Sequence, residues 1–253
     1  MRKLLILSAL VFATINLMAE PIFKQIKYPN GLVRMEGLFD EGKPVGEIKR
    51  YHENGVLQGI QVFDIEGNST AQIYAGDGTL SARGKYKGQK KDGLWHYYAS
   101  SGYTFMMENY EEGVRQGEAL VFSADSVVLE RMFFVDGLLN GERLSYYPYG
   151  NVMFRYTYEM GVLNGPYQFF FESGSVGEEG MFVNGKKDGI WKVYDVESPE
   201  VQEINYVDGV ATNQAELDAE LQKKLDSYFE PNMSNSDIEE LIVKLLDEWK
   251  KKG

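Results

Sequence analysis

The sequence has 253 residues, of which 43% are hydrophobic and 25% charged, and it contains no cysteine. Without a thiol the chain can form neither a disulfide framework, nor a thiol nucleophile, nor a cysteine-ligated metal site. The 38 acidic residues exceed the 26 basic ones and give a formal net charge of −12, which disfavours binding to nucleic acid or to an anionic membrane.

The first segment has the pattern of a secretory signal peptide. Arg2 and Lys3 precede an apolar run that ends at Ala19. A basic start, an apolar centre and a small residue at the cleavage position are features of such signals. We therefore expect residues 1–19 to be removed and the protein to be exported, to a periplasmic, outer-membrane-associated or secreted location. An uncleaved anchor is the alternative, although the run is shorter than the roughly 20 residues of a membrane span.

An aromatic residue recurs every twelve positions through most of the chain, and glycines recur at twice that interval. A fixed period of this kind indicates a repeat architecture, here with a unit of 24 residues. The aromatic positions are Tyr74, Tyr86, Tyr98, Tyr110, Phe122, Phe134, Tyr146, Tyr158, Phe170, Phe182, Tyr194 and Tyr206.

The repeat unit is expected to be a β-hairpin. Many of its glycines follow Asn or Asp, and such pairs accept the positive φ of tight turns. The stretches between them are rich in Tyr, Phe, Val and Met, which suit strands, whereas glycine at this density would break a helix. With turns centred on Asn140, Asn164 and Asp188, the aromatics would form one cross-strand ladder on one face and make up the core.

These patterns predict a mainly β fold over residues 20–210, in the form of an elongated single-layer antiparallel β-sheet of tandem hairpin repeats. After residue 210 the period becomes helical, and Ser236 stands three residues before Glu239, as in a capping box. We expect an α-helical hairpin over residues 211–253 that covers the last strands and reaches Trp191 first. A partner-binding helix is the alternative. Its second half carries one apolar stripe of Ile238, Leu241, Ile242, Leu245, Leu246 and Trp249.

Three stretches of the repeat carry a family resemblance. Residues 146–150 (YYPYG), 158–165 (YEMGVLNG) and 182–191 (FVNGKKDGIW) resemble repeats of the MORN-repeat-variant proteins, a bacterial group that includes YwqK-type proteins labelled as antitoxins. The resemblance extends over about residues 28–210. It implies a MORN-like array of hairpins and a role as a protein-interaction platform, with phospholipid binding proposed for some related repeats.

Residues that alternate with the ladder aromatics are expected to point to the second face of the sheet. These positions hold Trp95 and Tyr97 in one repeat and Tyr167 in another. Because two short helices cannot cover the whole array, we expect Trp95 and Tyr97 to form an open patch that binds a protein partner, with Tyr167 at its border. A curved sheet or a second copy of the chain covering this patch is the alternative.

Residues able to do chemistry are few. His52 and His96 have no second histidine near them in sequence, and we expect both to be surface or packing residues. Arg83, Arg131 and Arg155 share one repeat column, which predicts either an anion-binding stripe or ordinary solvated charges. No pattern supplies a nucleophile with a base or three metal ligands, so we expect no enzymatic activity, no catalytic residue, no metal and no cofactor.

The predicted function is an exported, non-enzymatic protein-interaction scaffold. The alternatives are an immunity or antitoxin protein that neutralises a secreted toxin, and a peripheral phospholipid-binding module, which the negative charge disfavours. We expect a protein partner and no nucleic acid, and a homo-oligomer stays open.

Overall fold

The computed structural model describes residues 20–196, 201–213, 215–216, 218–219 and 222–223. They fall into two compact units, one that ends at Ser126 and one that begins at Val127. The predicted signal peptide of residues 1–19 lies outside the described residues, as does most of the predicted helical hairpin of residues 211–253. Within the described ranges, no helix is long and apolar enough to cross a membrane.

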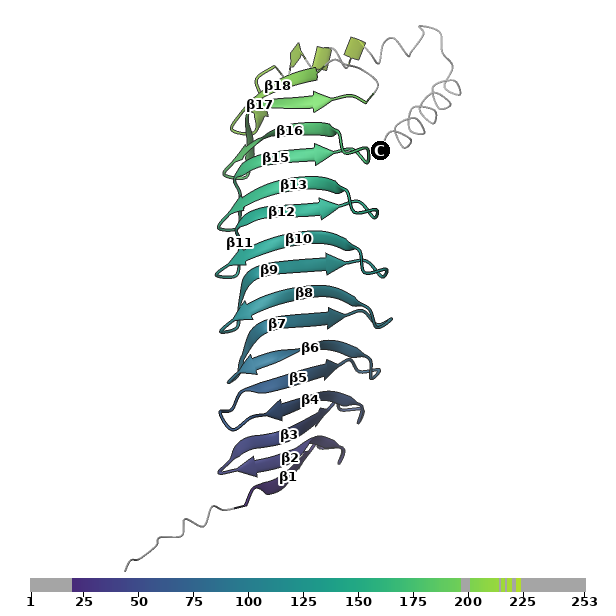
Figure 1. The fold of residues 1–253 in the computed structure, drawn as a ribbon, viewed down its shortest axis with the longest axis vertical. Coiled ribbons are helices and arrows are strands. Elements are labelled where there is room, and N and C mark those ends of the chain that lie inside the picture. Colours follow the sequence, from purple (N-terminus) through teal and green to yellow (C-terminus); the bar gives the residue numbers. More distant parts are fainter. Residues whose placement is uncertain (1–19, 197–200, 214, 217, 220–221, 224–253) are drawn as a thin grey trace, which may run out of the picture. The chain divides into compact units, whose positions relative to one another are not determined.

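The described part of the first unit is an antiparallel sheet whose strands follow one another in chain order (Figure 1). From β2 to β9, each strand pairs with the strand before it. The strands are β1 (Ile22–Lys27), β2 (Val33–Asp40), β3 (Lys43–Tyr51), β4 (Leu57–Phe63), β5 (Ser69–Tyr74), β6 (Leu80–Lys87), β7 (Lys90–Tyr98), β8 (Thr104–Glu111) and β9 (Val114–Phe122).

The second unit repeats the same antiparallel order. Its two-residue strands β11, β14 and β19 each follow a tight turn, and β11 and β14 lead into the next hairpin arms, β12 and β15. The strands are β10 (Val128–Val135), β11 (Leu138–Leu139), β12 (Gly141–Tyr146), β13 (Val152–Glu159), β14 (Val162–Leu163), β15 (Gly165–Phe170), β16 (Val176–Val183), β17 (Lys186–Tyr194), β18 (Val201–Val207) and β19 (Val210–Ala211). The predicted mainly β fold of antiparallel hairpin repeats is therefore confirmed.

Two-residue turns close one end of the hairpins. At Asn184–Gly185 the two φ angles are 50° and 81°, and the flanking Val183 pairs with Lys186. Two successive positive φ values define the type I′ turn, whose twist matches that of the strands. The same geometry occurs at Glu41–Gly42, Glu112–Gly113, Asp136–Gly137, Met160–Gly161 and Asp208–Gly209.

The predicted register of the hairpins is wrong. The turn was expected at Asp188, but it lies four residues earlier, at Asn184–Gly185. Gly189 also has a positive φ, of 69°, yet it lies inside strand β17, close to a shift in the β16–β17 register. The second glycine of each repeat therefore serves an irregularity of the strand, as in a β-bulge, rather than a turn.

The aromatic positions consequently divide between the two faces of the sheet, and the single ladder does not exist. Phe182 lies opposite Lys187 and not opposite the next aromatic of the series. In the first unit Tyr86 packs against Trp95 on one face, whereas Tyr98 stacks on His96 on the other, with ring centroids 6.5 Å apart.

We call the side of each unit's strands that carries the buried tryptophan the tryptophan face. In the first unit it holds Trp95, Tyr97 and the residues paired with them, and in the second unit it holds Tyr167, Trp191 and their pairing partners. The other side is the opposite face. Apart from Phe134, the twelve-step aromatics are only half-buried, so the core lies mainly on the tryptophan face. It includes Trp95, which the sequence predicts to lie in an open patch, and Tyr167, which the sequence predicts to lie at the border of that patch.

Candidate protein-interaction surface

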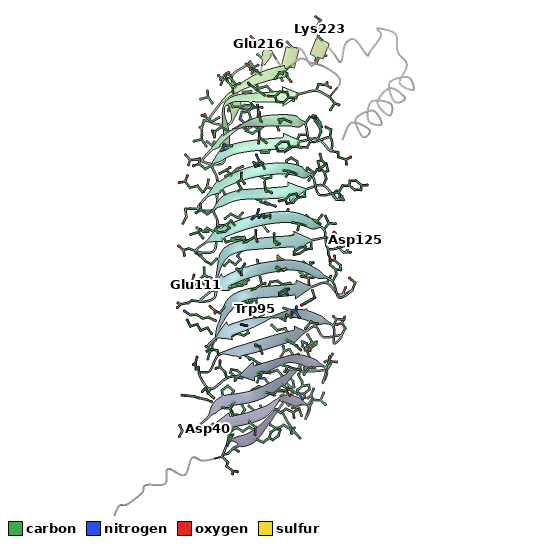
Figure 2. All side chains as sticks on the ribbon, in the orientation of Figure 1. Asp40, Trp95, Glu111, Asp125, Glu216 and Lys223 are labelled. Atoms are coloured by element: carbon green, nitrogen blue, oxygen red, sulfur yellow. The ribbon has the colours of Figure 1, made fainter. Side chains whose placement is uncertain are left out.

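A row of residues across the strands forms the core of the first unit. Ile48, Trp95 and Ala119 are buried almost completely, with exposed fractions of 0%, 0% and 1%. Trp95 lies opposite Glu108, which in turn lies opposite Ala119. Figure 2 shows Trp95 between the two margins of the sheet, with Asp40 and Glu111 at one margin and Asp125 at the other.

Glycine provides the space for each tryptophan. A Cβ atom placed on Gly84 would lie 2.3 Å from Cδ2 of Trp95, and one on Gly180 would lie 2.2 Å from Cδ2 of Trp191. Ordinary carbon contacts are about 3.5–4.0 Å, so each indole ring lies directly on the backbone of the preceding strand. The indole nitrogens donate to backbone oxygens of those same strands, Trp95 to Lys85 at 3.0 Å and Trp191 to Met181 at 3.2 Å.

The prediction that Trp95 lies in an open patch is therefore wrong. Trp95 is fully buried and Tyr167 is 8% exposed, because neighbouring strands contribute glycine, alanine and aromatic rings around them. Tyr97 remains half-buried at the surface of the cluster. Of the three predicted binding residues, Tyr97 is thus the one most available to a partner.

A lysine lies inside the aromatic cluster of the first unit, a feature that the sequence analysis missed. Nζ of Lys91 lies 4.4 Å, 5.0 Å and 4.9 Å from the ring centroids of Trp95, Tyr97 and Tyr110. Such cation–π contacts are favourable, more so when partly desolvated. The available signal was the near-identity of residues 90–95 (KKDGLW) and 186–191 (KKDGIW).

Hydrogen bonds connect this lysine to a buried carboxylate. Lys91 donates to the Tyr97 hydroxyl at 2.8 Å, and the Tyr110 hydroxyl donates to Oε2 of Glu108 at 2.6 Å. The two hydroxyl oxygens are 3.0 Å apart. Because the single Tyr110 proton points to Glu108, Tyr97 is the donor between them. Arg115 lies 3.6 Å from the other Glu108 oxygen, so the buried charge is compensated.

Burial also shifts the acid–base properties of this cluster. Desolvation lowers the pKa of Lys91, with the Glu108 charge acting in the opposite direction. Desolvation, followed by the hydrogen bond with Tyr110, raises the pKa of Tyr97 well above its usual range. Both shifts favour uncharged forms, as expected for groups moved from water into an aromatic environment.

A groove lies beside the cluster on the same unit. It has a volume of about 630 Å³ and is lined by Pro44, Arg50, Gln61, Ala71 and Tyr86, among others. Gly59 and Ala71, which have little or no side chain, leave room on the tryptophan face beside Gln61. Arg50 donates to Gln61 at 2.7 Å and remains exposed, so the groove combines a cation with apolar walls.

The tryptophan face of the second unit has the same design with more aromatic rings. Tyr167 stacks on Trp191 with centroids 5.1 Å apart, and Phe182 meets Trp191 edge-on at 5.0 Å. Lys187 lies 3.8 Å from the Trp191 ring and 2.8 Å from Glu178. Desolvation, followed by the Glu178 charge, raises the pKa of Tyr167.

The opposite face carries polar rows. In the second unit Arg155, Gln168 and Glu179 lie on consecutive strands of one row. Arg155 donates to Gln168 at 3.1 Å and lies 3.6 Å from Glu142. Since Arg155 has acidic and amide neighbours, the predicted column of arginines does not form a uniformly positive stripe there. Arg83 lies opposite His96 in the first unit.

The two histidines have structural surroundings. His52 lies in a loop, where Nε2 is 3.0 Å from the backbone oxygen of Tyr74 in the next repeat. His96 stacks on Tyr98, and burial, followed by the Arg83 charge, lowers its pKa. Over the described residues, no group of three or more His, Asp or Glu side chains is placed to hold a metal ion.

Comparison with known families supports the predicted resemblance to MORN-repeat-variant proteins. Residues 44–64 match the family model for the MORN repeat variant. These residues comprise most of β3, all of β4 and the loop between them, which is one hairpin of the first unit. No curated protein matches the chain. MORN repeats are consistent with a repeat-based interaction module.

Proposed function

We propose that the chain is an exported, non-enzymatic scaffold that binds a protein partner through the tryptophan face of the first unit. The proposal rests on one observation: that face combines half-buried Tyr97, the amino group of Lys91 and the groove beside Arg50. Interaction sites commonly combine a well-packed aromatic anchor with an adjacent pocket and an arginine. The sheet holds these groups in a fixed geometry, which lowers the entropy cost of binding.

The lack of a cysteine and the presence of two isolated histidines favour a binding protein over an enzyme. The exported location rests on the signal-peptide pattern of residues 1–19. An immunity or antitoxin role would be a special case of the same scaffold, in which the partner is a secreted toxin. A lipid-binding role would need a basic surface, and removal of Arg2 and Lys3 with the signal would change the net charge from −12 to −14.

The test is capture of partners by the mature chain immobilised on a resin, with proteins of the native envelope as the input. Arg50→Ala removes an exposed side chain of the tryptophan-face groove, and Lys49→Ala is the matched control on the opposite face of the same strand. We expect Arg50→Ala and Tyr97→Ser to reduce capture of the partner, while Lys49→Ala and His96→Ser retain it.

Circular dichroism of each variant checks that the sheet is intact. Equal capture by folded Arg50→Ala and Tyr97→Ser would remove this face as the binding surface. Capture of phosphatidylglycerol vesicles instead of any protein would favour the lipid-binding alternative.

A further inference from the structure

The tryptophan face of the second unit carries a continuous network of nine aromatic rings. Successive centroids in the network are 5.0–6.5 Å apart. Tyr167 and Trp191 are buried within it, while the other rings are half-buried and keep part of their surface open. The rings belong to Phe154, Tyr156, Tyr158, Tyr167, Phe169, Phe171, Phe182, Trp191 and Tyr206.

The charged side chains of this face already have partners. Arg143 donates to both carboxylate oxygens of Glu130, at 2.9 Å and 3.0 Å, beside the Tyr156 ring. Lys187 is paired with Glu178 at 2.8 Å. To an approaching segment, the face therefore offers aromatic surface rather than unpaired charge, and an open patch of this kind indicates a docking site.

The C-terminal segment of the same chain has a stripe that fits this surface. From Ile238 to Trp249, six apolar residues recur at helical spacing. As a helix, this stretch would be about 17 Å long at 1.5 Å per residue. The aromatic network runs across β13, β15, β16, β17 and β18, and four strand spacings of about 4.8 Å give roughly 19 Å. The stripe and the network thus have similar lengths.

The chain can bring the stripe to the network. The described sheet ends with Ala211 in β19, which lies opposite Tyr206, a member of the network. Residues 212–237 connect Ala211 to the stripe, and the described residues 215–216, 218–219 and 222–223 among them are helical. Even a wholly helical stretch of this length would span about 39 Å, which is longer than the network. A tethered segment also acts at a millimolar effective concentration, which favours it over a second copy at ordinary protein concentrations.

We propose that residues 238–249 dock as an amphipathic helix on the aromatic network of the second unit, within the same chain. This proposal does not rest on the proposed function. Its consequence is that the second unit's tryptophan face is occupied by the chain itself, which leaves the first unit's tryptophan face for a partner.

The test uses the absence of cysteine from the natural sequence, so that each introduced pair of thiols is the sole pair in the molecule. Leu245→Cys is combined with Val193→Cys or Ile204→Cys on the tryptophan face of the mature chain. The matched controls combine it with Lys192→Cys or Asn205→Cys, which are adjacent residues on the opposite face. A short bismaleimide is added at low protein concentration, and cross-linking within one chain is followed by mass spectrometry.

Docking should make the tryptophan-face pairs cross-link within the chain about tenfold or more faster than their opposite-face controls, because the effective concentration rises on one side only. Adding Leu241→Glu to the stripe should abolish that preference, whereas Glu240→Gln beside it should not. Equal rates on the two faces at both strands would overturn the proposal. Cross-links that form only between chains would also overturn it and would assign the face to a second copy.

Discussion

Trp95 packs directly on Gly84. The loss of stability caused by Gly84→Ala should therefore depend strongly on whether the Trp95 indole is present. In Gly84→Ala the new methyl group would lie 2.3 Å from the indole, which must then move by more than 1 Å. Trp95 is fully buried, bonded to the Lys85 oxygen and in edge-on contact with Tyr86 at 5.0 Å, so it has little freedom to move. Overpacking of this kind destabilises by about 1–3 kcal/mol.

Removing the indole should remove this penalty. Trp95→Ala should itself cost about 3–5 kcal/mol, as expected for deletion of a large buried aromatic side chain. In that background the methyl group of Gly84→Ala enters the vacated space and should change the free energy of unfolding by less than about 0.5 kcal/mol. The effect of Gly84→Ala in the natural sequence minus its effect in the Trp95→Ala background is the coupling energy of a double-mutant cycle.

Urea denaturation of the four proteins, followed by far-ultraviolet circular dichroism, measures the cycle. Gly76→Ala is the matched control, because Gly76 has no atom within 4 Å of its Cβ position and no positive φ. It should leave the midpoint unchanged. The packing argument would be refuted if Gly84→Ala were as harmless as Gly76→Ala, or equally destabilising with and without the indole.

Three further effects follow from the contacts. Trp191→Ala should destabilise the chain by about 3–5 kcal/mol, and Phe170→Ala by clearly less. Trp191 is fully buried, whereas Phe170 is half-buried on the other face. Equal shifts of the two variants in thermal melting would instead support the aromatic ladder as the core. The hydrogen bond to Glu36 raises the pKa of Tyr51 to about 12, so the protonated hydroxyl stabilises the fold below pH 10 and this contribution is lost between pH 10 and 12. The stability advantage over Tyr51→Phe should shrink in that window, and a pH-independent difference would contradict it. Asn54 donates from Nδ2 to the Gly76 oxygen of the next repeat at 3.1 Å, so Asn54→Ala should cost about 1 kcal/mol, whereas Glu53→Ala in the same loop should leave the unfolding midpoint unchanged.

The sequence period predicts the hairpins, but it does not distinguish turn glycines from bulge glycines. Asn184–Gly185 and Asp188–Gly189 are chemically similar pairs, and both glycines adopt positive φ. Only the strand pairing shows that the first is the turn and the second lies within β17. A turn centred on Asp188 would pair Phe182 with Tyr194, whereas the observed two-residue turn pairs Phe182 with Lys187. Tyr194 lies seven residues after Lys187, an odd number, so it points to the other face, and this is why the predicted ladder fails.

The candidate surface could be predicted only in part for a related reason. Residues such as Trp95 and Tyr97 were correctly placed on one face, because alternation along a strand is local. Burial of Trp95 depends on Gly84, which lies eleven residues earlier on the paired strand. The same spacing joins Gly180 to Trp191 and Gly37 to Ile48, so a search for glycine eleven residues before a large side chain would have found these contacts. The repeated KKDG motif before each tryptophan points to the lysine, but the hydrogen bonds of Lys91 also involve residues of β8, which this motif does not include.

The claim that a partner binds the tryptophan face of the first unit is tested most directly by two adjacent methionines of β8. Met106 lies opposite Tyr97 on the tryptophan face, and Met107 lies opposite His96 on the opposite face. Both are half-buried, and methionine is readily oxidised to its sulfoxide. Hydroxyl-radical footprinting of the purified complex measures the oxidation of both residues. The partner should lower the oxidation of Met106 and leave that of Met107 unchanged. Protection of Met107 alone would contradict binding at the tryptophan face.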